Sequence, residues 1–191
     1  MFHQIQEFDT HLFLALNGLH TPWLDTLMYY VTQRNTWIPL YVVLVVWLIG
    51  TYKQRAPGMI GSLVLTIIIA DQTTSSLFKP LFERLRPCHV TYLQGKIHLV
   101  VEGCGGTYGF ASSHAANSVG LAMALYLLVG QRHPWVHWFF APWAAAVSYS
   151  RIYVGVHYPL DVLVGSLVGL AAAVIAVKSV EKLLALKKRT A

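Results

Sequence analysis

The sequence has little charge. Of its 191 residues, 12% are charged and 55% are hydrophobic, and the mean hydropathy is +0.52. A soluble domain typically has about 25% charged residues, so this composition excludes an ordinary soluble protein. It predicts an all-α protein whose helices form a bundle across a membrane. The length leaves little chain for a second domain.

Two further features are absent. Residues 1–10 lack the basic stretch, apolar core and small-residue cleavage site of a signal peptide, so we expect no removable signal. The formal net charge is +6, but the basic residues lie at the ends of apolar segments and form no single stripe. Nucleic acid is therefore not an expected partner, and the sequence specifies no oligomeric state.

Five apolar segments come close to the roughly 20 residues that a membrane-spanning helix needs. We expect spans over residues 37–52, 58–78, 112–129, 135–150 and 159–177. They belong to a helical bundle of residues 35–178, with residues 79–110 as one long connection. A structureless connection of this length is uncommon unless it is functional.

The first 34 residues are more polar than these segments. We expect two interfacial helices there, of which residues 5–18 form an amphipathic one. The alternative counts residues 8–33 as a sixth span, which would move the N-terminus to the other side of the membrane and leave the other connections in place.

The basic residues predict the orientation. With five spans, Lys53, Arg55, Arg132 and the basic tail of residues 179–191 all lie on one side. Short basic loops mark the cytoplasmic side. We therefore expect an inner-membrane protein whose connection 79–110 faces the periplasm or its equivalent.

The only two cysteines, Cys88 and Cys104, both lie in that connection. An oxidising compartment favours a disulfide between them, and the alternative is two free thiols. His89, His98 and Glu102 are also in the connection, but no pair among them has a close metal-ligand spacing. We expect neither a metal nor another cofactor.

Three polar clusters flank the apolar segments, at residues 79–87, 111–114 and 150–161. Charged groups at the margin of a hydrocarbon layer are costly, so they indicate function. The clusters place three cations at one membrane face: Lys79, Arg86 and Arg151. Few acids lie nearby, because Arg84 is expected to offset Glu83. This excess of positive charge predicts an anionic ligand, and phosphate is the simplest one.

Two histidines supply candidate chemistry. His157 and Asp161 are four residues apart at a helix start, so the carboxylate can orient the imidazole as a neutral nucleophile. Ser112, Ser113 and His114 come where a loop enters a helix, whose first N–H groups bind anions, and His114 is the candidate general acid. Taken singly, such residues are more often interface anchors, snorkelling side chains or helix caps.

These residues together resemble the three-part signature of the type 2 phosphatidic acid phosphatase superfamily, which also contains vanadium haloperoxidases and bacterial acid phosphatases. The matching positions are Lys79 with Arg86-Pro87, Ser112 to His114, and Ser150-Arg151 with His157 and Asp161. The resemblance implies a phosphohistidine intermediate on His157, oriented by Asp161, with His114 as the acid. It also implies that Lys79, Arg86, Ser112 and Arg151 hold phosphate.

Two positions depart from the family pattern. The family usually has Pro-Ser-Gly-His where this chain has Ala111-Ser112-Ser113-His114. Ser113 therefore either offers phosphate its amide alone, with the side chain turned away, or adds a hydroxyl contact of its own. No catalytic group is lost, so we expect activity.

The residues and the resemblance together imply an integral membrane lipid phosphatase that removes a terminal phosphate from a lipid mono- or diphosphate. Family substrates include undecaprenyl diphosphate, phosphatidylglycerol phosphate, phosphatidic acid and lipid A, and the sequence does not choose among them. The alternatives are a lipid phosphotransferase that uses the same phosphohistidine and a non-catalytic binder or transporter of anionic lipids. A vanadate-dependent oxidant is disfavoured, because such members are typically soluble.

Overall fold

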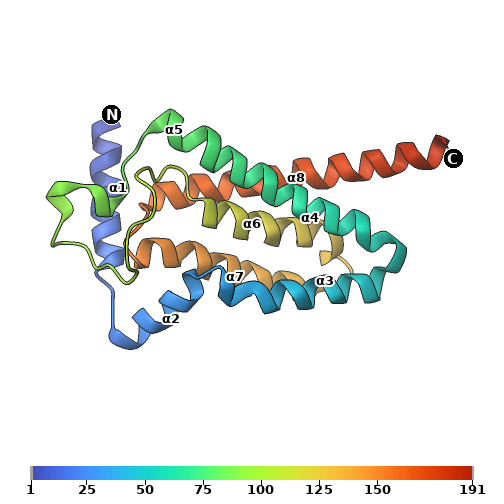
Figure 1. Ribbon diagram of the computed structural model, residues 1–191, viewed down its shortest axis with the longest axis horizontal. Helices are drawn as coiled ribbons and strands as arrows, with labels where there is room; N and C mark the ends of the chain where they lie inside the picture. Colours follow the sequence, from blue (N-terminus) through green and yellow to red (C-terminus); the bar gives the residue numbers. More distant parts are fainter. Residues whose placement is uncertain (1, 191) are drawn as a thin grey trace.

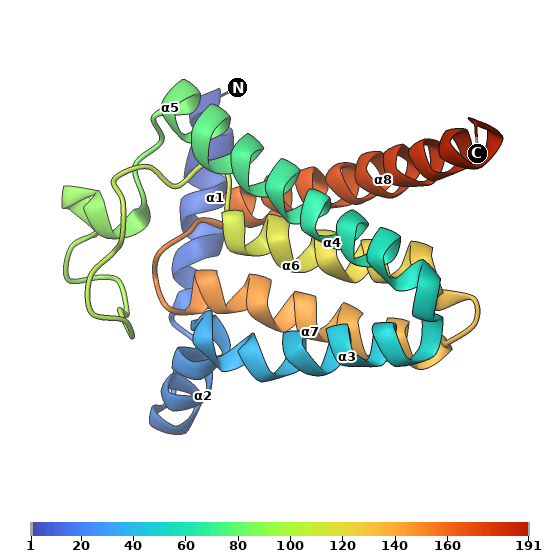
Figure 2. The same cartoon turned by 45° about the vertical axis from the view of Figure 1, so that its right-hand side comes forward.

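The computed structural model describes residues 2–190, and all of the regular secondary structure in this range is helical. Five helices lie side by side along the long axis of the molecule (Figures 1 and 2). They are α3 (Ile38–Tyr52), α4 (Ala56–Asp71), α6 (Ser113–Leu125), α7 (Pro134–Tyr153) and α8 (Pro159–Thr190). The prediction of an all-α helical bundle is confirmed.

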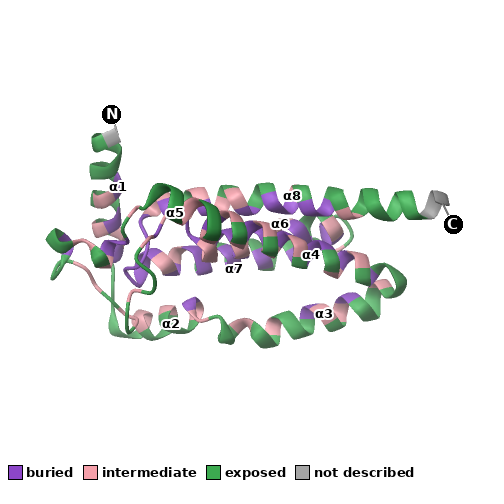
Figure 3. Ribbon diagram, turned by 45° about the horizontal axis from the view of Figure 1, so that its top comes forward, coloured by how far each residue is buried: buried purple, intermediate pink, exposed green. Residues whose placement is uncertain are grey.

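Helix α6 is the centre of this bundle and packs against α4, α7 and α8. The interior between the helices is apolar, with the side chains of Leu48, Leu125, Val136 and Phe140 all at most 2% exposed. Figure 3 shows buried residues along the inward faces, whereas α3 and the outer half of α8 are mostly exposed. Exposed apolar faces of this kind suit contact with lipid.

Within the described residues 2–190, three helical stretches are long and apolar enough to cross a membrane: Asn35–Phe82, Ser113–Gly130 and Pro159–Lys187. The first of them reverses direction at a 3₁₀ turn, Lys53–Arg55, so that α3 and α4 are antiparallel (Figure 2). The last stretch is longer than we predicted. Helix α8 continues past Val177, so the basic tail residues lie on the same helix.

Two further helices lie at one end of the bundle, as predicted for the N-terminal segment. Helix α1 (Phe2–Asn17) runs across this end, and α2 (Pro22–Thr32) leads obliquely from the loop after α1 to the start of α3 (Figure 1). The side chain of Asn17 anchors α1 to the bundle, because its amide donates hydrogen bonds to the carbonyls of Tyr153 (2.7 Å) and His98 (2.9 Å). We call this end of the molecule the connection end.

The long connection lies at the same end. Helix α4 continues as a π-helix over Gln72–Phe78 and then as the short helix α5 (Lys79–Phe82). Between α5 and α6 the chain is irregular, apart from two 3₁₀ turns at Pro87–His89 and Thr91–Leu93. The polar last third of the second predicted span is therefore helical, and it carries polar side chains to the connection end.

Glycines allow α6 and α8 to approach closely. A Cβ atom on Gly165 would lie 2.3 Å from the carbonyl oxygen of Ser112, and one on Gly169 would lie 2.3 Å from that of Ala116. Both distances are shorter than any real Cβ contact. Small residues at such crossings let helix backbones pack against each other in membranes.

Gly169→Val should therefore destabilise the protein. The branched side chain would push α8 away from α6, and overpacking of this kind costs about 2 kcal/mol or more. We expect the unfolding temperature in detergent to fall by several degrees. Gly61→Val is the matched control, because a Cβ on Gly61 meets nothing within 4 Å. Equal effects of the two substitutions would contradict this account of the packing.

Candidate active site

A cavity of about 550 Å³ lies at the connection end. Its lining comes from segments that are far apart in the sequence. These are residues 32–35 at the end of α2; Asp71, Ser75 and Lys79 of the α4–α5 helix; Arg86 and residues 101–106 of the connection; Ser113 and His114 of α6; Arg151 in the last turn of α7; and Val156 and His157 between α7 and α8. The structure thus brings six of the predicted site residues to one cavity.

Two predicted site residues lie behind this lining. Ser112 is fully buried and caps α6, where its hydroxyl accepts a hydrogen bond from the Ala115 N–H at 3.5 Å. Its own N–H donates to the carbonyl of Asp161 at 2.9 Å. Asp161 is also 0% exposed and supports His157 from behind. Ser112 therefore joins the start of α6 to the start of α8, and its hydroxyl is not part of the cavity lining.

His157 and Asp161 form a buried pair. The chain turns sharply after α7, and Pro159 then begins α8, so that His157 Nδ1 lies 3.3 Å from Asp161 Oδ2. The same oxygen accepts a hydrogen bond from the Tyr158 N–H at 3.1 Å. Burial lowers the pKa of His157 well below its usual 6.5, and the positive charges of nearby arginines act in the same direction. The imidazole is therefore neutral at physiological pH.

The second oxygen of Asp161 is held by an arginine from the connection. Arg84 Nη1 donates to Asp161 Oδ1 at 2.8 Å, and Arg84 Nη2 donates to Asp9 Oδ2 at 2.6 Å. The guanidinium also lies over the ring of Tyr158, 4.1 Å from its centroid. Our expectation that Arg84 offsets Glu83 was wrong. Glu83 is exposed, whereas the two buried carboxylates need a partner more because they have lost their hydration.

Asp9 extends this arrangement to the N-terminal helix. Its other oxygen, Oδ1, accepts a hydrogen bond from the Leu160 N–H at 2.9 Å, and the residue is only 4% exposed. Helix α1 is thereby fixed to the first turn of α8. The sequence had shown Asp9 only as one polar residue of an amphipathic helix, so its structural role was missed.

The cations of the cavity differ from Arg84 in having no carboxylate partner. Among the side chains that the structure describes, Lys79, Arg86 and Arg151 form no ion pair. Arg151 Nη1 donates to the hydroxyl of Thr32, but its Nε is buried without a hydrogen-bond partner. A buried cationic donor that is left unsatisfied is costly. An anion in the cavity would satisfy it.

The hydroxyl of Ser113 contacts the lysine of the cavity. Its Oγ accepts a hydrogen bond from Lys79 Nζ at 3.0 Å. It also lies 2.9 Å from the hydroxyl of Thr74 and 3.0 Å from that of Ser75, both on the π-helical segment. The residue that replaces the family's glycine therefore holds the lysine of the cavity in place.

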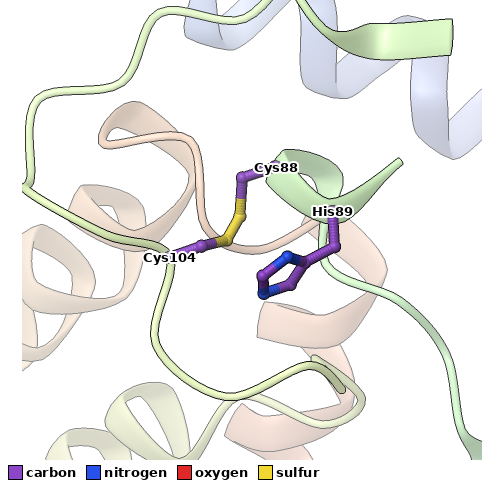
Figure 4. A group of neighbouring side chains, drawn as sticks. All are labelled: Cys88, His89 and Cys104. Carbon is purple, nitrogen blue, oxygen red and sulfur yellow. A yellow bond between two sulfur atoms is a disulfide. The ribbon is translucent and has the colours of Figure 1, made fainter. Parts of the chain in front are cut away.

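The two cysteines of the connection are paired. The structure joins Cys88 to Cys104, whose Cα atoms are 6.1 Å apart, and the ring of His89 lies beside the sulfur atoms (Figure 4). The three side chains are close enough to hold a metal ion, but a disulfide has no thiolate to offer as a ligand. Because Cys104 lines the cavity, the disulfide ties its wall to the segment that follows Arg86.

Three more charged residues of the lining come from outside the predicted set. Arg34 contributes a fourth cation, whereas Asp71 and Glu102 contribute carboxylates. The Asp71 Oδ1 lies 3.5 Å from the hydroxyl of Ser75, one turn farther along the same continuous helix. His98 is not among the residues that line the cavity, and its Nε2 lies 2.9 Å from Asp25 Oδ1.

Comparison with known proteins identifies relatives. The profile of the PAP2 superfamily matches residues 60–185. The chain is 37% identical to the lipid A 4'-phosphatase of Bacteroides thetaiotaomicron over 171 residues, which cover 88% of this chain and 75% of the relative. It is 30% identical to the undecaprenyl-diphosphatase of Sulfolobus acidocaldarius over 168 residues, which cover 85% of this chain and 73% of the relative.

A solved structure shows the same fold. The crystal structure of LpxE from Aquifex aeolicus superposes with a TM-score of 0.69 and 26% sequence identity, covering 88% of this chain and 94% of the other. The similarity therefore extends over the whole bundle.

Asp9→Asn should destabilise the protein, because it removes one of the two charges that face Arg84 in a buried site. We expect a loss of roughly 1–3 kcal/mol in unfolding free energy, measured as thermal unfolding in detergent. Glu83→Gln is the control for the alternative pairing, and it should change stability by less than about 0.5 kcal/mol. A larger effect from Glu83→Gln than from Asp9→Asn would contradict the observed pairing.

Ser113→Ala should weaken anion binding. Without the hydroxyl, Lys79 loses its 3.0 Å acceptor, and a lysine side chain that is less well ordered binds phosphate less tightly. We expect the dissociation constant for inorganic phosphate, measured from ligand-induced thermal stabilisation, to rise by roughly threefold to tenfold. Ser76→Ala is the control, because Ser76 is exposed and bonds only to Gln72. An unchanged affinity would show that Ser113 does not position Lys79.

Proposed function

Because the chain belongs to the PAP2 superfamily, we propose that the cavity at the connection end is its active site and that His157 carries a phosphohistidine intermediate. The protein is a membrane lipid phosphatase, a hydrolase of phosphoric monoesters or diphosphates. One observation supports the site above all. Two histidines and a set of cations without carboxylate partners line the same cavity.

The cations would hold the phosphoryl group. Lys79, Arg86 and Arg151 supply charged donors around the cavity, and the N–H groups of Ser113 and His114 begin α6, where the positive end of the helix dipole points at the ligand. In phosphoryl transfer, negative charge spreads over the equatorial oxygens, and fixed positive groups stabilise it. These residues provide the charge stabilisation for which other phosphatases use metal ions, so the proposed reaction needs no metal or other cofactor.

In the first step the neutral His157 acts as the nucleophile. The Nδ1–H of His157 donates a hydrogen bond to Asp161, so the other ring nitrogen, Nε2, carries the free lone pair. Nε2 forms a bond to phosphorus, and the bond from phosphorus to the lipid oxygen breaks. His114 gives its proton to the departing oxygen, and the dephosphorylated lipid leaves.

Water completes the cycle. His114, now neutral, takes a proton from a water molecule as that water attacks the phosphorus of the phosphohistidine. The bond from phosphorus to Nε2 breaks, inorganic phosphate forms, and both histidines return to their starting states. Arg84 and Asp9 take no part in bond making, but they fix the carboxylate that orients the nucleophile.

We also propose the membrane topology. The five bundle helices cross the inner membrane, α1 and α2 lie at its outer interface, and the cavity opens toward the periplasm. The turn at Lys53–Arg55 and the turn that contains Arg132 lie at the opposite end from the cavity (Figure 2), as the positive-inside rule requires if that end is cytoplasmic. Residues 1–34 then form the interfacial part, residues 35–178 the phosphatase bundle and residues 179–191 a cytoplasmic tail.

The substrates are lipid phosphates whose tails remain in the bilayer. The named relatives include a lipid A 4'-phosphatase and an undecaprenyl-diphosphatase, so both a sugar-linked phosphate monoester and a polyprenyl diphosphate belong in the first panel. Phosphatidic acid and phosphatidylglycerol phosphate complete it.

The proposal is tested by phosphate release from this panel with purified protein in detergent. His157→Ala should lower kcat by at least about a thousandfold, and Asp161→Asn should lower it by about a hundredfold or more with little change in KM. His114→Ala should slow substrates with poor leaving groups most. His89→Ala is the matched control, a histidine at the same end that is not among the residues lining the cavity. Near-native rates in all three site variants would contradict the assigned roles.

Three further measurements separate the alternatives. Activity that persists with a metal chelator agrees with histidine chemistry, whereas its loss would require a metal. If the phosphoryl group is transferred to an added acceptor lipid and no free phosphate is released, the protein is a phosphotransferase. If the wild type releases no phosphate and His157→Ala binds lipid as well as the wild type does, the protein is a binder or transporter.

A further inference from the structure

Arg34 is a cation of the cavity that the phosphatase mechanism does not use. It follows α2, it is exposed, and it lines the same cavity as Lys79, Arg86 and Arg151. Among the side chains that the structure describes, it has neither an ion pair nor a hydrogen bond. Its charge nevertheless acts on Lys79 and Arg151. Because the nearby cations repel its charge and no carboxylate pairs with it, an anion that binds beside Arg34 would be stabilised.

The position of Arg34 is fixed by a residue of the active site. The hydroxyl of Thr32, the last residue of α2, accepts a hydrogen bond from Arg151 Nη1. Two residues of chain span at most about 7 Å, so Arg34 is kept close to that guanidinium. A 3₁₀ turn begins at once with Asn35, which limits how far the segment can move away.

The cavity has a floor and a rim. His157 is 2% exposed and Arg86 is 8% exposed, so the phosphoryl group that His157 attacks lies at the floor. Arg34 and Gln33 are more open to solvent and form part of the rim. In-line attack places the leaving oxygen on the side of phosphorus that faces away from His157. The part of the substrate beyond that oxygen therefore extends from the floor toward the rim.

We propose that Arg34, with Gln33 beside it, forms a second anion subsite at the rim of the cavity, which binds a second phosphate group of the lipid substrate. Arginine's planar fork matches a phosphate group bidentately. The two carboxylates of the lining, Asp71 and Glu102, leave the four cations in excess. The subsite deepens the proposed phosphatase function and rests on it, because it explains which lipid phosphates the cavity selects.

The second phosphate can have two sources with the same chemistry. In a lipid diphosphate it is linked directly to the phosphoryl group at the floor. In a lipid whose sugar headgroup carries two separate phosphates, it lies farther along the substrate. In both cases Arg34 favours lipids with two phosphates over those with one.

Soluble probes test the subsite without depending on turnover. Binding of orthophosphate, methylenediphosphonate and a hexose bisphosphate is measured as ligand-induced thermal stabilisation of the full chain in detergent. Methylenediphosphonate represents the directly linked pair, and its P–C–P bridge is not hydrolysed. The hexose bisphosphate represents the separated pair, and orthophosphate reports the floor alone.

Arg34→Gln should weaken binding of at least one of the two-phosphate probes by about tenfold or more, and binding of orthophosphate by less than about threefold. The probe that loses affinity identifies the source of the second phosphate. Arg34→Lys should lose less than Arg34→Gln, because it keeps the charge without the fork. Arg55→Gln is the matched control, an exposed arginine in a 3₁₀ turn at the other end of the bundle, and it should change none of the three affinities.

Two results would overturn the subsite. One is unchanged affinity for both two-phosphate probes in Arg34→Gln. The other is an equal loss for all three probes, which would show that Arg34 only adds to the general positive field. A lipid assay keeps this test separate from that of the proposed function: wild-type protein that releases no phosphate from any lipid disproves the phosphatase, whereas release with equal discrimination in wild type and Arg34→Gln disproves only the subsite.

Discussion

The structure depends on the buried carboxylate of Asp161. One of its oxygens lies 3.3 Å from His157, and the other accepts a hydrogen bond from Arg84 at 2.8 Å. A carboxylate without a partner at this depth would cost several kcal/mol, so Arg84 and its second partner, Asp9, are needed for the pair to persist. His157, the proposed nucleophile, is thus oriented by a chain of charges that begins on α1, an element outside the bundle.

The partners of Arg84 also bear on the excess of positive charge in the cavity. Arg84 pairs with the two buried carboxylates, Asp9 and Asp161, whereas none of the cavity's other cations forms an ion pair with a described side chain. The Nε of Arg151 is buried without a hydrogen-bond partner. Electrostatic stabilisation of a transition state works best when the donors are already fixed and do not have to leave another partner. The pairing of Arg84 therefore stabilises the fold, and in the proposed mechanism the unpaired cations of the cavity bind the phosphate.

Most of the fold was predictable because its signals are local. Apolar segments of membrane-spanning length, the proline that begins α8 and the amphipathic pattern before residue 18 each predict a helix without knowledge of its neighbours. The prediction differed from the structure where the sequence carried only a weak signal for the end of a helix. The end of α8 was placed at Val177, where the apolar run ends, but the helix continues because nothing in the following residues stops it.

The sequence by itself determined the class of protein and the candidate chemistry, because composition, segment length and the spacing of His157 and Asp161 are properties of short stretches. Only the tertiary structure decided which distant residues meet at the cavity and behind it. It joined Arg84 to carboxylates 75 and 77 residues away, placed Ser112 behind the cavity lining and brought Arg34 to its rim. No local pattern specifies such contacts, since they follow from which helix ends meet, and that depends on the packing of the whole bundle.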